Sequence, residues 1–123
     1  IYSLRRMLDP IKEHVDNNFN PLPTEYINEF MPIRQKINDL MKMSCEQIET
    51  SRYENYREIL AEADACKDEL SVLRKKHIDR LQNMKDNTLM QISLVYLNVL
   101  QESQEFLSVM RHQLRAAKKF MEN

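Results

Sequence analysis

Apolar side chains recur at helical spacing along almost the whole chain. In the segments 24–50, 52–82 and 88–120 they follow one another at intervals of three and four residues, which is the period of one face of an α-helix. The three stripes consist of Ile27, Phe30, Ile33, Ile37, Leu40, Met41, Ser44 and Ile48; of Tyr56, Ile59, Ala63, Cys66, Leu70, Leu73, His77 and Leu81; and of Ile92, Tyr96, Val99, Ser103, Phe106, Met110, Leu114 and Ala117. This pattern predicts three long amphipathic helices that share a core.

A proline-rich break separates a shorter segment from these helices. Residues 19–23 contain Pro21 and Pro23, which prevent regular structure and predict a linker. Residues 1–18 carry apolar side chains near helical spacing, so we expect either a fourth, short helix or a strap. Because the linker is a credible hinge, this segment either completes the bundle of its own chain or is exchanged with a second copy.

Polar residues mark the expected ends of the long helices. Thr24 is a suitable N-cap for the first of them. Ser51 and Glu54 have the spacing of a capping box, which predicts that a new helix starts at residue 52. Asp86 or Asn87 is expected to cap the last helix.

Short turns between long helices determine the expected fold. They place consecutive helices side by side in opposite directions. We therefore predict an all-α fold, an antiparallel up-down bundle of three long helices plus a short N-terminal helix, in one domain spanning residues 1–123. The chain starts within a helical pattern at Ile1, so we expect a domain excised from a longer protein.

Composition excludes several classes of function. The 123 residues include no glycine, which rules out glycine-rich phosphate loops and dinucleotide-binding turns. A net charge of −1 argues against nucleic acid as a partner and against broad affinity for anionic membranes. No apolar run approaches the roughly 20 residues of a membrane span. If the two helices form a hairpin, Cys45 and Cys66 lie about 12 Å apart along its axis, so we expect both to be reduced and buried.

The start of the last predicted helix is apolar on a second face. Met90, Leu94 and Leu97 point away from the stripe that faces the bundle. A helix that is apolar on both sides is buried on both sides. Either the N-terminal segment packs there as a fourth helix, or these three residues form an interface with a partner.

The acidic and histidine residues offer only a weak candidate for a metal site. None of the three histidines belongs to the Glu-x-x-His pattern of a di-metal bundle site, and His77 has the phase of a core residue. Asp64 and Asp68 lie one helical turn apart and could hold a divalent cation together. Their phase also fits a solvated face. No grouping predicts catalysis.

Basic residues gather toward the ends of two helices. One cluster spans residues 74–80, and the other consists of Arg111, His112, Arg115, Lys118 and Lys119. Cations at these positions offset the helix dipole. The second cluster is expected to form ion pairs with Glu54, Glu58 and Glu62 of the preceding helix. The alternative is contact with phosphate or lipid headgroups through Arg111, Arg115, Lys118 and Lys119.

Two stretches, residues 63–81 and 94–120, resemble the PhoU-like helical bundles. The likeness is greatest to the cytosolic C-terminal domains of some bacterial inorganic phosphate transporters. The resemblance implies a non-enzymatic regulatory domain on the cytoplasmic side of the inner membrane, in contact with the membrane-transporter portion of its parent protein. The isolated domain is expected to be soluble.

The resemblance also bears on metal binding. PhoU proteins carry Glu/Asp-x-x-x-Asp motifs that bind metal clusters, and Asp64 and Asp68 match that spacing. In the last helix the matching place reads Gln101-x-x-x-Glu105, so an amide replaces one ligand. With Glu102 and Glu105 as further candidates, a divalent metal or iron is the cofactor considered, although we expect none.

Two other functions compete with this one. A self-associating helical adaptor would form a homodimer through Met90, Leu94 and Leu97. A metal-dependent enzyme or metal store would use the acidic residues, but the missing Glu-x-x-His pairs argue against it.

Overall fold

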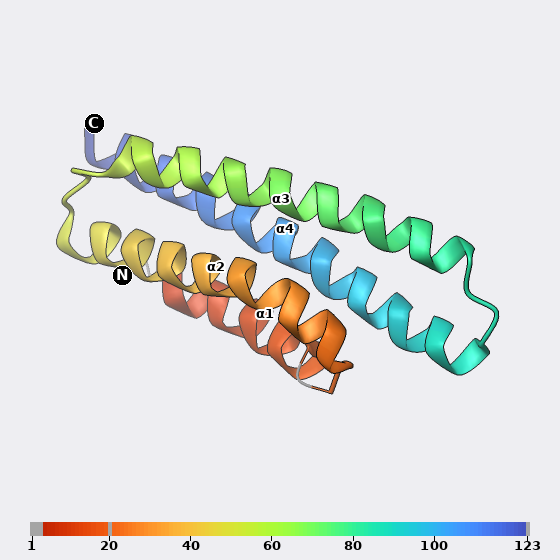
Figure 1. Ribbon diagram of the computed structural model, residues 1–123. Helices are drawn as coiled ribbons and strands as arrows, with labels where there is room; N and C mark the ends of the chain where they lie inside the picture. The colour runs from red at the N-terminus through yellow and green to blue at the C-terminus, as the bar shows by residue number, and fades with distance from the viewer. Residues whose placement is uncertain (1–3, 20, 123) are drawn as a thin grey trace.

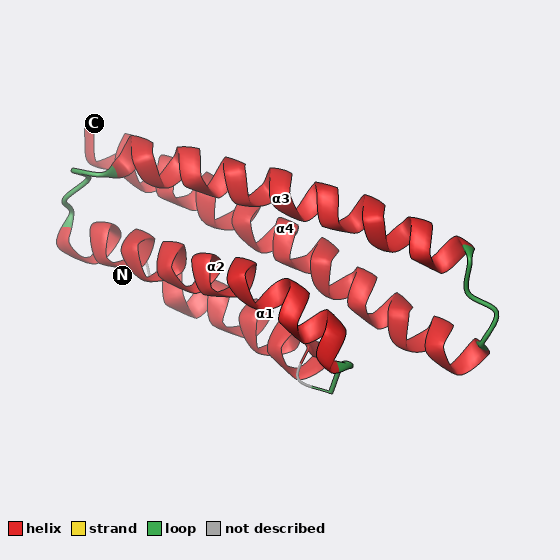
Figure 2. Cartoon of the chain, viewed as in Figure 1, coloured by secondary structure: helices red, strands yellow, loops and turns green. Residues whose placement is uncertain are grey.

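The computed structural model describes residues 4–19 and 21–122, and every regular element in them is a helix (Figures 1 and 2). The helices are α1 (Leu4–Phe19), α2 (Thr24–Thr50), α3 (Tyr56–Gln82) and α4 (Asn87–Glu122). The predicted all-α fold is confirmed. Within this part of the chain, no helix has the length and apolar character needed to cross a bilayer.

Consecutive helices run in opposite directions and pack side by side (Figure 1). Helix α4 contacts all three others, and α2 also contacts α1 and α3. The hairpin of α3 and α4 extends past the start of α2 and the end of α1, so its far end is covered by fewer neighbours (Figure 1).

The core is built from the predicted stripes and one additional row on α4. Tyr96, Val99 and Met110 of the predicted stripe are fully buried. Leu100 and Leu107 are fully buried as well, although the single stripe did not include them. Because α4 packs against three helices, its apolar face has to be wider than that of a helix with fewer neighbours.

The end of α2 differs from the prediction. Ser51 adopts a left-handed conformation with φ 55° and ends the helix, while the Arg52 amide donates to the Gln47 carbonyl at 3.1 Å. Helix α3 begins at Tyr56, after Asn55. The predicted capping box at Ser51 and the start at residue 52 are therefore wrong, because Ser51 terminates one helix instead of capping the next.

The two other predicted caps have different outcomes. Helix α2 does begin at Thr24, but Pro23 occupies the cap position and no side chain bonds the first turn. At α4 the Asp86 carboxylate accepts a hydrogen bond from the Leu89 amide at 3.1 Å. The cap predicted at Asp86 is confirmed.

The N-terminal segment forms a helix against α4 of the same chain. Phe19, predicted to lie in the linker, is the last residue of α1 and is fully buried. Its ring meets the Phe30 ring edge-on at 5.0 Å, and the Arg34 guanidinium lies 5.0 Å above it. Because α1 extends to Phe19, the linker is shorter than predicted. The contacts with Phe30 and Arg34 hold the end of α1 against α2.

Both cysteines are buried and free, as predicted. Burial raises the pKa of the Cys66 thiol to about 11, so the thiol stays protonated and unreactive at neutral pH. Burial likewise raises the pKa of Cys45. The two thiols act as small apolar packing groups.

The second row on α4 can be tested by truncating Leu107. Because Leu107 is fully buried, Leu107→Ala should lower the free energy of unfolding by about 2–5 kcal/mol. Val72, which is 68% exposed, is the control, and Val72→Ala should change it by less than about 0.5 kcal/mol. Urea denaturation followed by circular dichroism measures both. Equal effects would contradict a core role for Leu107.

Candidate functional site

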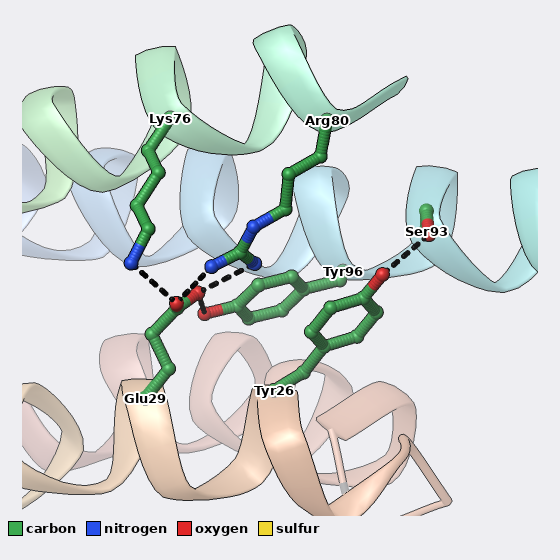
Figure 3. A network of polar contacts seen from close by, with 6 residues as sticks. All are labelled: Tyr26, Glu29, Lys76, Arg80, Ser93 and Tyr96. Atoms are coloured by element: carbon green, nitrogen blue, oxygen red, sulfur yellow. Dashed lines mark hydrogen bonds and ion pairs between the residues drawn. The ribbon is translucent and has the colours of Figure 1, made fainter. Parts of the chain in front are cut away.

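The densest polar feature joins α2, α3 and α4 around the carboxylate of Glu29 (Figure 3). Arg80 donates to both Glu29 oxygens, including Nη1 to Oε1 at 3.1 Å. Lys76 Nζ donates to Oε2 at 3.2 Å, and the Tyr96 hydroxyl donates to Oε1 at 2.9 Å. The carboxylate thus ties one side of α2 to both helices of the α3–α4 hairpin.

Three rings pack beside this carboxylate. Tyr26 and Tyr96 stack with centroids 4.6 Å apart, and His77 meets both rings edge-on. The Tyr26 hydroxyl shares a hydrogen bond of 2.7 Å with Ser93 Oγ (Figure 3). The hydroxyls of Tyr26 and Ser93 are therefore satisfied within an otherwise aromatic core layer.

His77 is a buried core histidine, as its phase predicted. Its Nε2–H donates to the Ser93 carbonyl at 2.7 Å, which fixes the neutral tautomer. Nδ1 is buried without a hydrogen-bond partner. Burial lowers the pKa of His77, because a second proton on Nδ1 would have no acceptor and no water.

The ionisation states of this cluster suit structure rather than catalysis. Burial opposes ionisation of Glu29, but the hydrogen bonds from Arg80, Tyr96 and Lys76 outweigh it and lower the pKa of Glu29. Burial, and then the bond to Glu29, raise the pKa of Tyr96. The carboxylate is held ionised by cations, and the phenol and the imidazole are held neutral. We interpret the cluster as a clamp between helices.

The sequence indicated only part of this clamp. His77 and Tyr96 lie on the predicted stripes, but Glu29 was not singled out. The available signal was its position: Glu29 lies next to Phe30 and three residues after Tyr26, at the edge of the core stripe. A carboxylate at such a place needs partners from another helix.

The four acidic candidates for a metal site are not brought together. Asp64 forms an ion pair with Arg111 at 2.9 Å, whereas Asp68 is exposed. Glu102 accepts a hydrogen bond from His14 of α1 at 3.2 Å, whereas Glu105 borders a depression beside α3. Among residues 4–19 and 21–122, no three His, Cys, Asp or Glu side chains are grouped to hold an ion. Among the described residues, α4 therefore brings no acidic side chain to Asp64 and Asp68 that would complete a metal site.

The basic cluster of α4 lies against the start of α3. Arg111 pairs with Asp64, not with the predicted Glu54, Glu58 or Glu62. Lys118 lies over the ring of Tyr56 at 5.0 Å. Arg115 and Lys119 are exposed and border the same shallow depression as Lys118. An anion contact by this cluster stays a prediction.

The second apolar face of α4 is left largely open by α1. His14 meets α4 at Glu102, and α1 ends five residues later, so its antiparallel register reaches about residue 97. Leu94 is 47% exposed, while Met90 and Leu97 are half-buried. The N-terminal segment does pack on α4 as a fourth helix, but it leaves Leu94 exposed. We call Met90, Leu94 and Leu97 the apolar surface.

No family model, curated protein or solved structure matches the chain.

The clamp predicts that neutralising Glu29 lowers the free energy of unfolding more than neutralising an exposed carboxylate does. Glu29→Gln leaves Arg80 without a counter-charge at a site that is 15% exposed, and should lower the free energy of unfolding by about 2 kcal/mol. The control is Glu69→Gln, which breaks an exposed α2–α3 pair with Lys36 and should cost less than about 1 kcal/mol. Chemical denaturation separates the two. A larger loss from the control would refute the clamp.

His77 predicts a loss of stability in mild acid. The pKa of His77 is lower in the folded protein than in the unfolded chain, where it is about 6.5, so the unfolded chain binds more protons in mild acid. The stability that neutral His77 contributes is fully present above the unfolded pKa. It is lost as the pH falls toward the folded pKa. Urea denaturation between neutral and mildly acidic pH should show a shallower pH dependence for His77→Gln than for the parent chain. An unchanged slope would contradict the assignment.

Proposed function

We propose that this chain is a non-enzymatic accessory domain that regulates an inorganic phosphate transporter by helix-mediated contact. In this proposal it lies on the cytoplasmic side of the inner membrane, joined to the membrane portion of its parent protein. The observation that carries the contact is the apolar surface of α4, which the bundle leaves open. The identity of the partner, a phosphate transporter, is inferred from the resemblance of residues 63–81 and 94–120 to the PhoU-like domains.

The location of the apolar surface supports a role in binding. It lies at the start of α4, where the α3–α4 hairpin extends past its neighbours (Figure 1). Leu94 is therefore accessible to a partner without any helix leaving the bundle. Below this surface the clamp of Glu29 and Arg80 fixes the hairpin on α2. A rigid support reduces the entropy lost on binding.

The chemistry of the described residues favours contact over catalysis. The Glu29 carboxylate is matched with Arg80 and Tyr96, and both thiols are protonated packing groups. The second candidate function, a self-associating adaptor unrelated to phosphate transport, is favoured by the same apolar surface. Two copies joined through Leu94 would cover each other's exposed face.

A charge placed on the apolar surface separates these functions. In the full-length parent protein, Leu94→Glu should change the initial rate of phosphate uptake by about fivefold, because it disrupts a regulatory contact. The matched control is Val72→Glu, which places the same charge on another exposed apolar residue and should leave uptake unchanged. Radiolabelled phosphate uptake by cells expressing each variant is the measurement.

Sedimentation of the chain tests the adaptor function. If Leu94→Glu converts a dimer to a monomer while uptake is unaffected, the adaptor function replaces the regulatory one. If neither quantity changes, the apolar surface is not the site of action.

A further inference from the structure

Cations at the seams of α2 with its neighbours are paired with carboxylates across the seam. Lys36 pairs with Glu69, Arg34 with Asp16, and Arg5 with Glu49, all at 2.9–3.1 Å. Together with the Glu29 clamp, these pairs cancel the positive charge at the seams between α2 and its neighbours.

At the seam between α3 and α4, a cation meets a neutral group. Arg74 Nη1 donates to the Gln104 side chain at 2.7 Å, and this amide does not cancel the charge of Arg74. Arg111, at the same seam, is paired with Asp64.

Two open depressions follow this seam along one flank of α4. The first is bordered by Lys67, Arg74 and a single carboxylate, Glu105; the second is bordered by Arg115, Lys118 and Lys119. Among the described residues, Glu105 forms no ion pair. Along α4, residues from one depression and then the other follow at intervals of three and four, so they share one face: Gln101, Glu105, Ser108, His112, Arg115 and Lys119. We call this flank the basic face.

The spread of the cations indicates the size of the anionic partner. Arg74 lies opposite Gln104, and Arg115 is 11 residues further along α4, or about 16 Å along the axis. One phosphate ion cannot touch both ends of such an array. An extended surface with many negative groups can. The same flank continues at helical spacing into Leu97 and the exposed Leu94, which is a suitable border for an interfacial contact.

We propose that the basic face rests on the headgroups of an anionic phospholipid bilayer. The net charge of −1 is a sum over the whole chain and does not describe the charge of this one face. Headgroup phosphates would approach Lys67 and Arg74 in one depression and Arg115 and Lys119 in the other. The inference does not depend on the proposed function, because a chain attached to no transporter would bind vesicles equally well.

Vesicle binding tests this proposal. The chain should co-sediment with phosphatidylglycerol–phosphatidylcholine vesicles, but not with phosphatidylcholine alone, and should be released by high salt. The triple variant Lys67→Gln, Arg115→Gln, Lys119→Gln should bind about 100-fold more weakly, from about fivefold per cation at a membrane surface. The matched control, Arg5→Gln, Lys36→Gln, Lys42→Gln, removes equal charge from α1 and α2 and should lower binding by less than about fivefold.

Each outcome decides the matter. Absence of binding to anionic vesicles, or an equal loss in both triple variants, overturns the basic face. Saturable binding of inorganic phosphate in calorimetry, with competition against vesicles, would assign the cations to a small anion instead. Circular dichroism of both triple variants verifies that the fold is retained, since all six substitutions lie outside the core.

Discussion

The structure depends on the simultaneous packing of α4 against three helices. A helix with one partner can bury a single stripe, but α4 buries two neighbouring rows, which include Tyr96 with Val99 and Leu100 with Leu107. Helix α2 also contacts the three others, but the contacts of α1 and α3 are more extensive with α4 than with α2, so the wide apolar face of α4 supports both of these helices. The polar clamp adds orientation: Glu29 and Arg80 determine the register of α2 along the hairpin.

Local sequence information predicted the helices because their period and their breaks are local properties. The spacing of apolar residues located the three long helices and left residues 1–18 as a fourth helix or a strap, and Asp86 or Asn87 indicated the start of the last helix. The features that were missed depend on neighbours distant in sequence. Ser51 could cap a helix or end one, and only the path of the chain into α3 decides between them. Leu100 and Leu107 lie outside the predicted stripe, and they are buried because α4 packs against three helices.

The site residues show the same division. The phase of His77 identified it as a core residue, because phase alone determines which face a side chain occupies. The spacing of Asp64 and Asp68 predicted their proximity, but it contained no information on Arg111, which reaches Asp64 from another helix. Net charge is a sum over the whole surface. It does not indicate that Lys67, Arg74, Arg115 and Lys119 border depressions along one flank of α4.

The position of α1 in the chain has a consequence for the order of folding. Helices α2, α3 and α4 are joined by short turns, so each hairpin closes a small loop. The contact of α1 with α4 joins His14 to Glu102, which are 88 residues apart in the sequence. Closing a loop of this length costs more chain entropy than closing the hairpins does. We therefore expect α2–α4 to form the early folding unit and α1 to dock last, which makes α1 the helix whose docking sets the slow step of folding.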